Sequence, residues 1–233
     1  MGHDTHAGLP PYQHHHFHSP QQQEEAAKMG MWVFLVTEIL MFSGLFVAYT
    51  VARFWYPETF LHSHEFLSIP MGALNTFVLI TSSLTMALAV RAAQTNNQKQ
   101  LSLQLLLTVL FALVFMVVKY FEYTHKFHDC LVPGLAGEFN LMGSAFGVGE
   151  HCEHAQHLLA MGGQPNLFFG LYFAMTGLHG LHVVVGIGVI LWIYFTRKRY
   201  SSEYYTPVEN VGLYWHLVDL VWIFLFPLLY LVK

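Results

Sequence analysis

The sequence has few charged residues and only two cysteines. Charged residues make up 10% of its 233 positions and the formal net charge is −4. No basic patch or stripe is present that could follow a phosphate backbone, which excludes nucleic acid as a partner. Cys130 and Cys152 are too few for a disulfide framework or a four-thiolate cluster site, which leaves one bridge between them as a candidate. A basic segment followed by an apolar stretch and a cleavage site is missing near residue 1, so we expect no signal peptide.

Apolar residues dominate what is present. Hydrophobic residues account for 55% of the chain and aromatic residues for 16%, and the mean hydropathy is +0.43, above the range of ordinary soluble domains. Lipid cannot satisfy open backbone groups, and the alternating pattern of a membrane barrel is absent, so each long apolar segment is predicted to be a helix. The predicted fold is all-α: five transmembrane helices in a membrane domain at 29–233, namely 29–52, 69–92, 101–123, 166–195 and 211–232.

Two polar regions lie outside the predicted helices. Residues 1–28 form a histidine-rich tail that we interpret as disordered, with metal binding by its clustered histidines as the alternative. The connection at 125–165 is expected to pack over one end of the bundle and contains both cysteines. Three of its histidines are weak candidates for zinc or copper ligands, and a solvent-facing loop is the simpler interpretation: His151, His154 and His157.

Basic residues near the helix ends predict the orientation, because they are enriched on the cytoplasmic side of membranes. Six would lie beside the N-terminus: Lys28, Arg91, Lys99, Arg197, Lys198 and Arg199. Three would lie opposite: Arg53, Lys126 and Lys233. We therefore predict a cytoplasmic N-terminus and a C-terminus on the outer side. The 125–165 loop is then outside, where Cys130 and Cys152 could oxidise to a disulfide.

Ionisable residues within the predicted spans are costly in a bilayer unless they are paired or face a cavity. Glu38 lies about nine residues into the first helix, and its own helix offers it no partner. It either holds or passes a proton, or forms a hydrogen bond to a facing helix. Lys119 and Glu122 are three residues apart and Lys126 follows, which permits ion pairing near the outer surface. We interpret this group as a structural clamp, with a headgroup or partner contact as the alternative.

The last two predicted helices carry histidines near the middle of the membrane. His179 and His182 are one turn apart, and the nearby Gly177, Gly180 and Gly186 favour close approach of another helix. His216 shares a helix face with Asp219, and we interpret it as bonded to that residue or to a neighbouring helix. With Glu38 these side chains are ligand types for iron or zinc, but HExxH and Glu-x-x-His spacings are missing from the spans. We therefore interpret these residues as a buried hydrogen-bond network, and we expect no catalysis by this chain on its own.

Five segments in chain order resemble subunit III of the haem-copper oxidases. They are GMWVFLVTEILMFSGLFV from residue 30, NTFVLITSS from 75, KYFEYTHKF from 119, TGLHGLHVVVG from 176 and YWHLVDLVWIFLF from 214. The resemblance implies the five-helix bacterial form, in the cytoplasmic (inner) membrane. It further implies a non-catalytic subunit of a proton-pumping cytochrome c or quinol oxidase that holds phospholipid and supports proton uptake or oxygen access. Its partners would be subunit I, which carries the haem and copper, and subunit II.

By the same resemblance, Glu38 is the family's intramembrane carboxyl group facing subunit I. The residues of its helix-packing motifs are Asn75, Glu122, His179, His182, Trp215, His216, Asp219 and Trp222. None of these residues is expected to bind haem or copper. The polar tail and the long outer loop depart from the family pattern, and they could contact a cytochrome or another respiratory complex.

Two other functions stay open from the sequence. One is the accessory subunit of a nitric oxide reductase, which shares the family's fold. The other is a proton-coupled transporter that uses Glu38 and Asp219 as proton relays. Internal repeats and broken helices, which are typical of transporters, are not apparent in the sequence.

Overall fold

The computed structural model describes residues 17–128, 131 and 165–231, and these residues are mainly helical. Five of their helices are long and apolar enough to cross a membrane: α1 (Pro20–Trp55), α3 (Ile69–Gln94), α4 (Gln98–His128), α7 (Pro165–Thr196) and α8 (Thr206–Tyr230). The predicted all-α fold with five membrane-spanning helices is confirmed. Cys130, Cys152 and the loop histidines His151, His154 and His157 lie outside the described residues.

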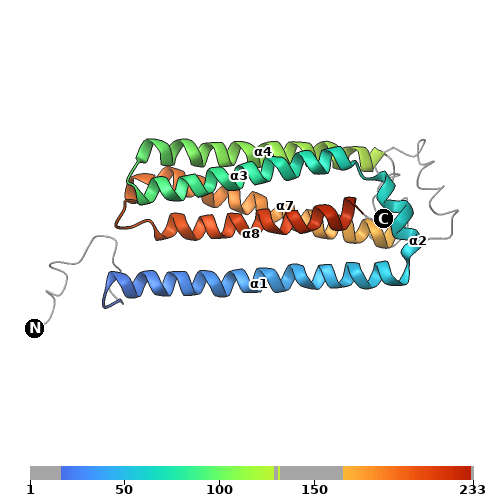
Figure 1. Cartoon of the computed structure of the whole chain (residues 1–233), viewed down its shortest axis with the longest axis horizontal. Helices are drawn as coiled ribbons and strands as arrows, with labels where there is room; N and C mark the ends of the chain where they lie inside the picture. The colour runs from blue at the N-terminus through green and yellow to red at the C-terminus, as the bar shows by residue number, and fades with distance from the viewer. Residues whose placement is uncertain (1–16, 129–130, 132–164, 232–233) are drawn as a thin grey trace, which may run out of the picture.

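Four of the long helices form a closed bundle. Helix α3 packs against α4 and α8, and α7 packs against the same two helices, so the contacts run around a ring. Helix α1 lies along one side of this bundle, against α7 and α8 (Figure 1). Its buried side chains fall on a stripe with a spacing of seven residues: Leu35, Phe42 and Tyr49, with Ala52 one turn further on. The rest of α1 is largely exposed and is available to lipid or to another subunit.

The start of α1 differs from the prediction, which placed residues 1–28 in a polar tail. The helix begins at Pro20, because Ser19 caps it: the Ser19 hydroxyl group accepts a hydrogen bond of 3.2 Å from the amide of Gln22. At about 1.5 Å per residue, its 36 residues span about 54 Å, well beyond a hydrocarbon core of about 30 Å. The polar first turns therefore project from the membrane. There Lys28 pairs with Glu24 at 2.7 Å and with Glu209 of α8 at 3.3 Å.

The connections between the helices are compact where the structure describes them. Between α1 and α3 the chain forms α2 (Pro57–Ser63) and the 3₁₀ turn η1 (His64–Phe66). The ring of Phe60 is buried there between Tyr49 and Phe168, with centroid distances of 5.1 and 5.3 Å. Between α3 and α4 the chain turns through Asn96, whose φ of 56° lies in the left-handed region that asparagine tolerates. Short connections favour antiparallel neighbours, and α3 and α4 pack in this way, whereas α1 packs against α7 and α8 instead of α3.

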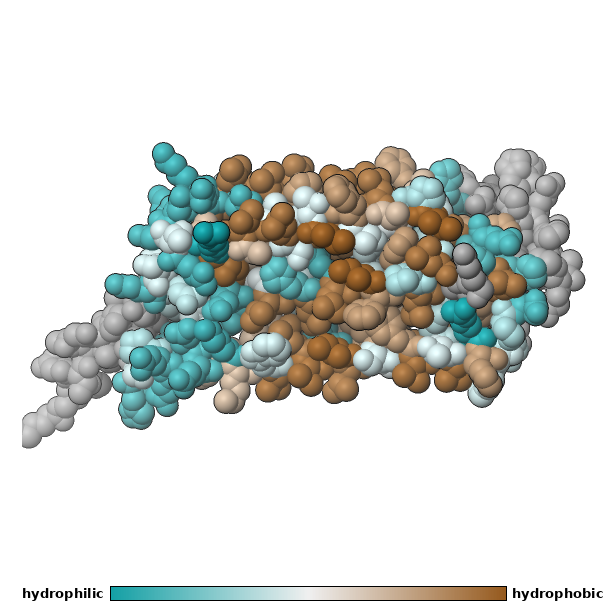
Figure 2. Space-filling model, in the orientation of Figure 1, coloured by the Kyte–Doolittle hydropathy of each residue, from teal (hydrophilic) through white to brown (hydrophobic). Residues whose placement is uncertain are grey.

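Surface hydropathy follows the membrane pattern. An apolar belt crosses the visible face between two hydrophilic ends (Figure 2).

Contacts at one end of the bundle bring basic residues together. The helix α4 contacts η2 (Arg197–Arg199), and the side chain of Gln98 donates to the carbonyl oxygen of Tyr200 at 2.6 Å. These contacts place the basic η2 and the α3–α4 turn at one end of the bundle, as the predicted topology requires. Their cytoplasmic location stays a prediction.

One glycine of α7 permits a close approach by α8. A Cβ atom on Gly186 would lie 2.6 Å from the Trp215 ring, closer than van der Waals contact allows. The indole nitrogen of Trp215 donates to the Ser82 hydroxyl group of α3 at 2.9 Å, so this contact joins three helices. A Cβ atom added to Gly180 would have no neighbour from the described residues within 4 Å. One added to Gly177 would meet the Tyr123 hydroxyl group at 4.0 Å, which is ordinary contact. Of the three glycines on which the packing prediction rested, Gly186 makes the close contact.

We expect the substitution Gly186→Ala to destabilise the protein by about 1–3 kcal/mol, the usual cost of overpacking a tight contact. The matched control is Gly180→Ala, which gains the same helix propensity without a clash. The measurement is thermal unfolding of the detergent-solubilised protein, followed by circular dichroism. Equal melting temperatures for the two variants would show that the Gly186 contact does not limit packing.

Candidate functional site

The intramembrane carboxyl group of α1 has a partner on α7. Glu38 follows the buried Leu35 by three residues and precedes Phe42 by four, so it lies on the stripe that faces the bundle. Its Oε2 atom is 2.9 Å from Nε2 of His182. Each side chain is 15% exposed, so the pair lies at the edge of the packed interior. Of the two interpretations left open for Glu38, the structure supplies the hydrogen bond to a facing helix, and that bond places a titratable partner beside the carboxyl group.

The other ring nitrogen of His182 determines how this pair holds a proton. Nδ1 lies 2.7 Å from the carbonyl oxygen of Leu178, and a carbonyl oxygen only accepts, so Nδ1 carries a hydrogen. In a neutral imidazole Nε2 is then an acceptor, and the proton between the residues belongs to Glu38. Transfer of that proton to Nε2 produces a carboxylate beside an imidazolium. Both forms contain one proton between Glu38 Oε2 and His182 Nε2.

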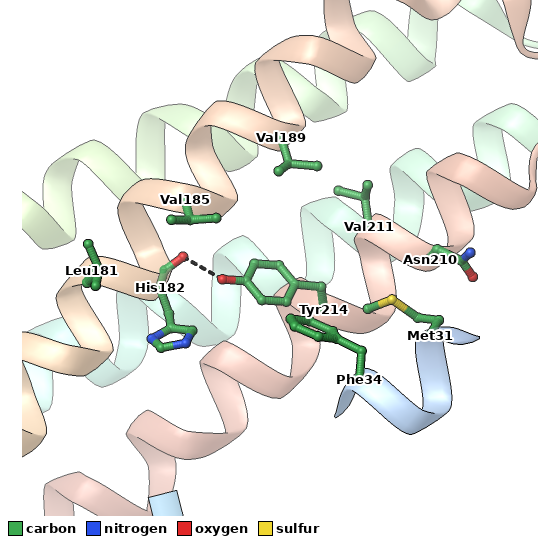
Figure 3. Close-up of a pocket in the computed structure, with 9 residues that line it drawn as sticks. All are labelled: Met31, Phe34, Leu181, His182, Val185, Val189, Asn210, Val211 and Tyr214. Carbon is green, nitrogen blue, oxygen red and sulfur yellow. Dashed lines mark hydrogen bonds between the residues drawn. The ribbon is translucent and has the colours of Figure 1, made fainter. Parts of the chain in front are cut away.

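An apolar cavity of about 320 Å³ adjoins the pair, between α1, α7 and α8. Figure 3 shows its lining, which comprises Met31, Phe34, Leu181, His182, Val185, Val189, Asn210, Val211 and Tyr214. The Tyr214 hydroxyl group donates to the carbonyl oxygen of His182 at 3.0 Å and ties α8 to this turn of α7. On the α1 side, the Phe42 ring packs edge-on against His182 at 5.3 Å. The arrangement can hold an apolar chain or a small apolar molecule beside one transferable proton.

A second polar cluster is buried between α4, α7 and α8. Lys119 Nζ lies 2.9 Å from Glu122 Oε2, as the three-residue spacing predicted. The carboxylate also accepts hydrogen bonds from the hydroxyl groups of Tyr172 and Tyr230, and the ammonium group donates to both of those oxygens. Lys126 donates to the carbonyl oxygen of Phe66 at 3.1 Å. Sequence reasoning missed both tyrosines, because a tyrosine in an apolar helix carries no local sign of its partner.

Aromatic rings enclose the ammonium group of Lys119. Its Nζ atom lies 5.0 to 5.7 Å from the ring centroids of Tyr123, Tyr172, Trp222 and Tyr230. These cation–π contacts supply attraction where water is excluded. The cluster therefore clamps three helices together, in agreement with the structural interpretation.

The other motif residues form separate contacts in the bundle interior. The Trp222 indole donates to the Thr76 hydroxyl group at 3.1 Å. His179 is fully buried and packs against Phe115 and Trp222, with centroid distances of 5.5 and 5.2 Å. Asn75 is also fully buried. His179 thus belongs to an aromatic core, although it is only one turn from His182.

His216 pairs with a neighbouring helix. Its Nδ1 atom lies 2.7 Å from the Ser83 hydroxyl oxygen of α3. Asp219, one turn further along α8, is 2% exposed, and among the described residues no hydrogen bond reaches either of its carboxylate oxygens. The sequence allowed either Asp219 or a neighbouring helix as the partner of His216, and in the structure the partner is Ser83 of the neighbouring helix α3.

The candidate ligands considered from the sequence do not converge. Glu38 and His182 contact each other, His179 lies in the aromatic core and His216 faces α3. In the part of the chain that the structure describes, no three His, Cys, Asp or Glu side chains form a group able to hold a metal ion. The described site chemistry is that of proton sharing and helix packing.

Removal of the Lys119 ammonium group by Lys119→Met should leave the Glu122 carboxylate buried without its ion pair. We expect a loss of about 3–5 kcal/mol in the free energy of unfolding, because an uncompensated charge remains in the interior. Adding Glu122→Gln should recover part of this loss. The check is a double-mutant cycle on unfolding in detergent. Additive effects of the two substitutions would contradict the coupling.

Comparisons with known proteins agree on one family. A family model described as "Cytochrome c oxidase subunit III" matches residues 12–148 and 141–233. The chain is 30% identical to "Cytochrome c oxidase subunit 3" of Thermostichus vulcanus over 87% of this chain and 86% of that protein. It is 29% identical to the protein of the same name from Synechocystis sp., over 92% and 79%. It is 27% identical to "Heme-copper oxidase subunit I+III" of Aeropyrum pernix, over 90% of this chain and 23% of that longer protein.

Proposed function

The chain belongs to the cytochrome c oxidase subunit III family, and on this basis we propose that it is the non-catalytic subunit III of a haem-copper terminal oxidase. The oxidase would reduce oxygen to water with electrons from cytochrome c or quinol, in the aerobic respiratory chain of a bacterial cytoplasmic membrane. Haem and copper would belong to subunit I. This chain would stabilise subunit I, hold phospholipid and support proton uptake or oxygen access.

The observation that carries this proposal is the Glu38–His182 pair beside an apolar cavity. Glu38 Oε2 and His182 Nε2 lie 2.9 Å apart at the edge of the bundle, and the hydrogen bond between them requires one shared proton. The adjoining lining is formed mainly by apolar side chains of three helices, which suits an acyl chain or oxygen. A proton store and an apolar path are what a supporting subunit would offer a neighbour that consumes protons and oxygen.

The partnership with subunit I has support of a second kind. The Aeropyrum pernix relative is named as subunit I and subunit III in one polypeptide. A fused chain keeps its two parts together, so a separate chain of the same family would need a non-covalent interface. The exposed apolar side chains of α1 and α3 provide surface for such contacts within the membrane.

The direct test is purification of the oxidase with and without this chain, from a strain in which its reading frame is deleted. We expect the depleted enzyme to retain its haem spectrum, to lose bound phospholipid and to inactivate after fewer turnovers. The measurements are oxygen consumption over time, phospholipid content and proton release by reconstituted vesicles. Unchanged turnover, lifetime and lipid content would contradict a supporting role.

Glu38→Gln tests the proton store within the intact complex. The amide preserves the shape of the carboxyl group and can still bond to His182, but it cannot release the proton. We expect normal assembly, with slower proton uptake or earlier inactivation under turnover. Thr37→Val is the matched control on the same helix, because Thr37 is exposed and its hydroxyl group donates to the carbonyl oxygen of Phe34 one turn away. Loss of assembly alone in Glu38→Gln would assign Glu38 to packing.

A further inference from the structure

A second groove crosses the apolar surface between α3 and α8, away from the Glu38 pair. Its volume is about 390 Å³, and its lining comprises Ile80, Ser83, Leu84, Ala87, His216, Asp219, Leu220 and Ile223. The rim is formed by exposed apolar side chains, among them Ile80, Leu84, Leu220 and Ile223. Figure 2 shows a small hydrophilic patch over α8 that interrupts the apolar belt of this face.

Asp219 is the polar group that the groove leaves without a partner. The residue is 2% exposed, and no hydrogen bond from the described residues reaches either carboxylate oxygen. Ser83 is a polar neighbour that also lies 2.7 Å from His216 Nδ1, and its hydroxyl group has a single hydrogen, so it can donate to at most one of the two carboxylate oxygens. Whether ionised or protonated, a carboxyl group has at least one oxygen that accepts a hydrogen bond. A buried acceptor without a donor is costly, and the cost is larger inside a bilayer.

The depth of Asp219 decides which molecules could supply that donor. It lies 13 residues after the start of α8 and 11 before its end, so about 20 Å and about 16 Å of helix separate it from the two ends. Lipid headgroups lie at the membrane surfaces and cannot reach this depth. Acyl chains reach it but carry no donor. A transmembrane helix with a polar side chain can supply both the donor and the apolar contact.

We propose that the α3–α8 groove is the docking surface for a transmembrane helix of the catalytic subunit, which places a hydrogen-bond donor against Asp219. The inference rests on the proposed function, since it locates the interface that subunit III requires. Small and polar residues commonly join helices in membranes, and Ala87 and Ser83 give the floor of the groove that character. The apolar rim would pack along the docked helix.

Filling the groove tests the proposal. Ala87→Trp places a large ring on an exposed position of the groove, and Ala174→Trp is the matched control at an exposed position on α7. Each variant is purified in mild detergent through a tag on this chain, and the co-purified haem-bearing subunit is measured by its spectrum. We expect Ala87→Trp to retain roughly tenfold less of that subunit, equivalent to about 1.4 kcal/mol, and Ala174→Trp to match the unaltered complex.

Photo-crosslinking tests the same surface without disturbing the fold. Benzoylphenylalanine replaces Leu220 on the rim or, as control, Leu113 on the exposed face of α4. Irradiation of whole membranes should give an adduct with the catalytic subunit from position 220 and none from position 113. Adducts at 220 with lipid alone, with a second copy of this chain or with a different subunit would overturn the proposal.

The outcomes separate this inference from the proposed function. If the unaltered chain co-purifies no haem-bearing subunit, the proposed function fails. If it does co-purify one and Ala87→Trp retains the full amount, the groove is not the docking surface and the proposed function stands. Asp219→Leu, which removes the acceptor, should lower retention as Ala87→Trp does, and full retention in that variant would contradict the donor contact.

Discussion

The whole structure depends on one constraint, which is that hydrocarbon offers no hydrogen bonds to a polar side chain. A polar side chain within the apolar belt therefore needs a hydrogen-bond partner from the protein, either on its own helix or on another one. The Trp215 and Trp222 indoles donate to hydroxyl groups of α3, and Glu122 of α4 accepts from tyrosines of α7 and α8. These bonds connect the helices of the ring in pairs and set their rotation about their axes. Shape complementarity at Gly186 then adds close packing between α7 and α8.

The same constraint distinguishes two kinds of polar residue. Lys119 and Glu122 are satisfied within the bundle by each other, by two hydroxyl groups and by surrounding rings, so they serve stability. Glu38 lies at the edge of the packed interior, and Asp219, although buried, lines the α3–α8 groove. Glu38 has a partner that can exchange one proton with it, and Asp219 has no described partner. Residues of the second kind are the ones through which a non-catalytic membrane subunit could act on a neighbour.

The position of α1 connects these features. It contacts α7 and α8 through a narrow stripe, and the four-helix ring closes without it. The apolar cavity lies where α1 and the ring do not fill the space between them. A helix held in this way can leave room for an acyl chain while it keeps Glu38 within reach of His182. On the opposite side of α8, the α3–α8 groove faces a separate partner, so lipid storage and subunit contact would use different surfaces of one helix.

The sequence by itself determined the five membrane-spanning helices and the Lys119–Glu122 pair, because apolar length and one-turn spacing are local properties of the chain. It also identified Glu38, His182, His216 and Asp219 as residues that need an explanation. Tertiary structure alone decided their partners, since Glu38 and His182 are 144 positions apart, and Ser83 and His216 are 133 apart. Which residues meet depends on the rotation of each helix about its axis, and hydropathy is nearly uniform around these helices. For that reason His179 and His182, neighbours in the sequence, belong to different environments, and Tyr172 and Tyr230 became visible as partners of Glu122 only in the folded bundle.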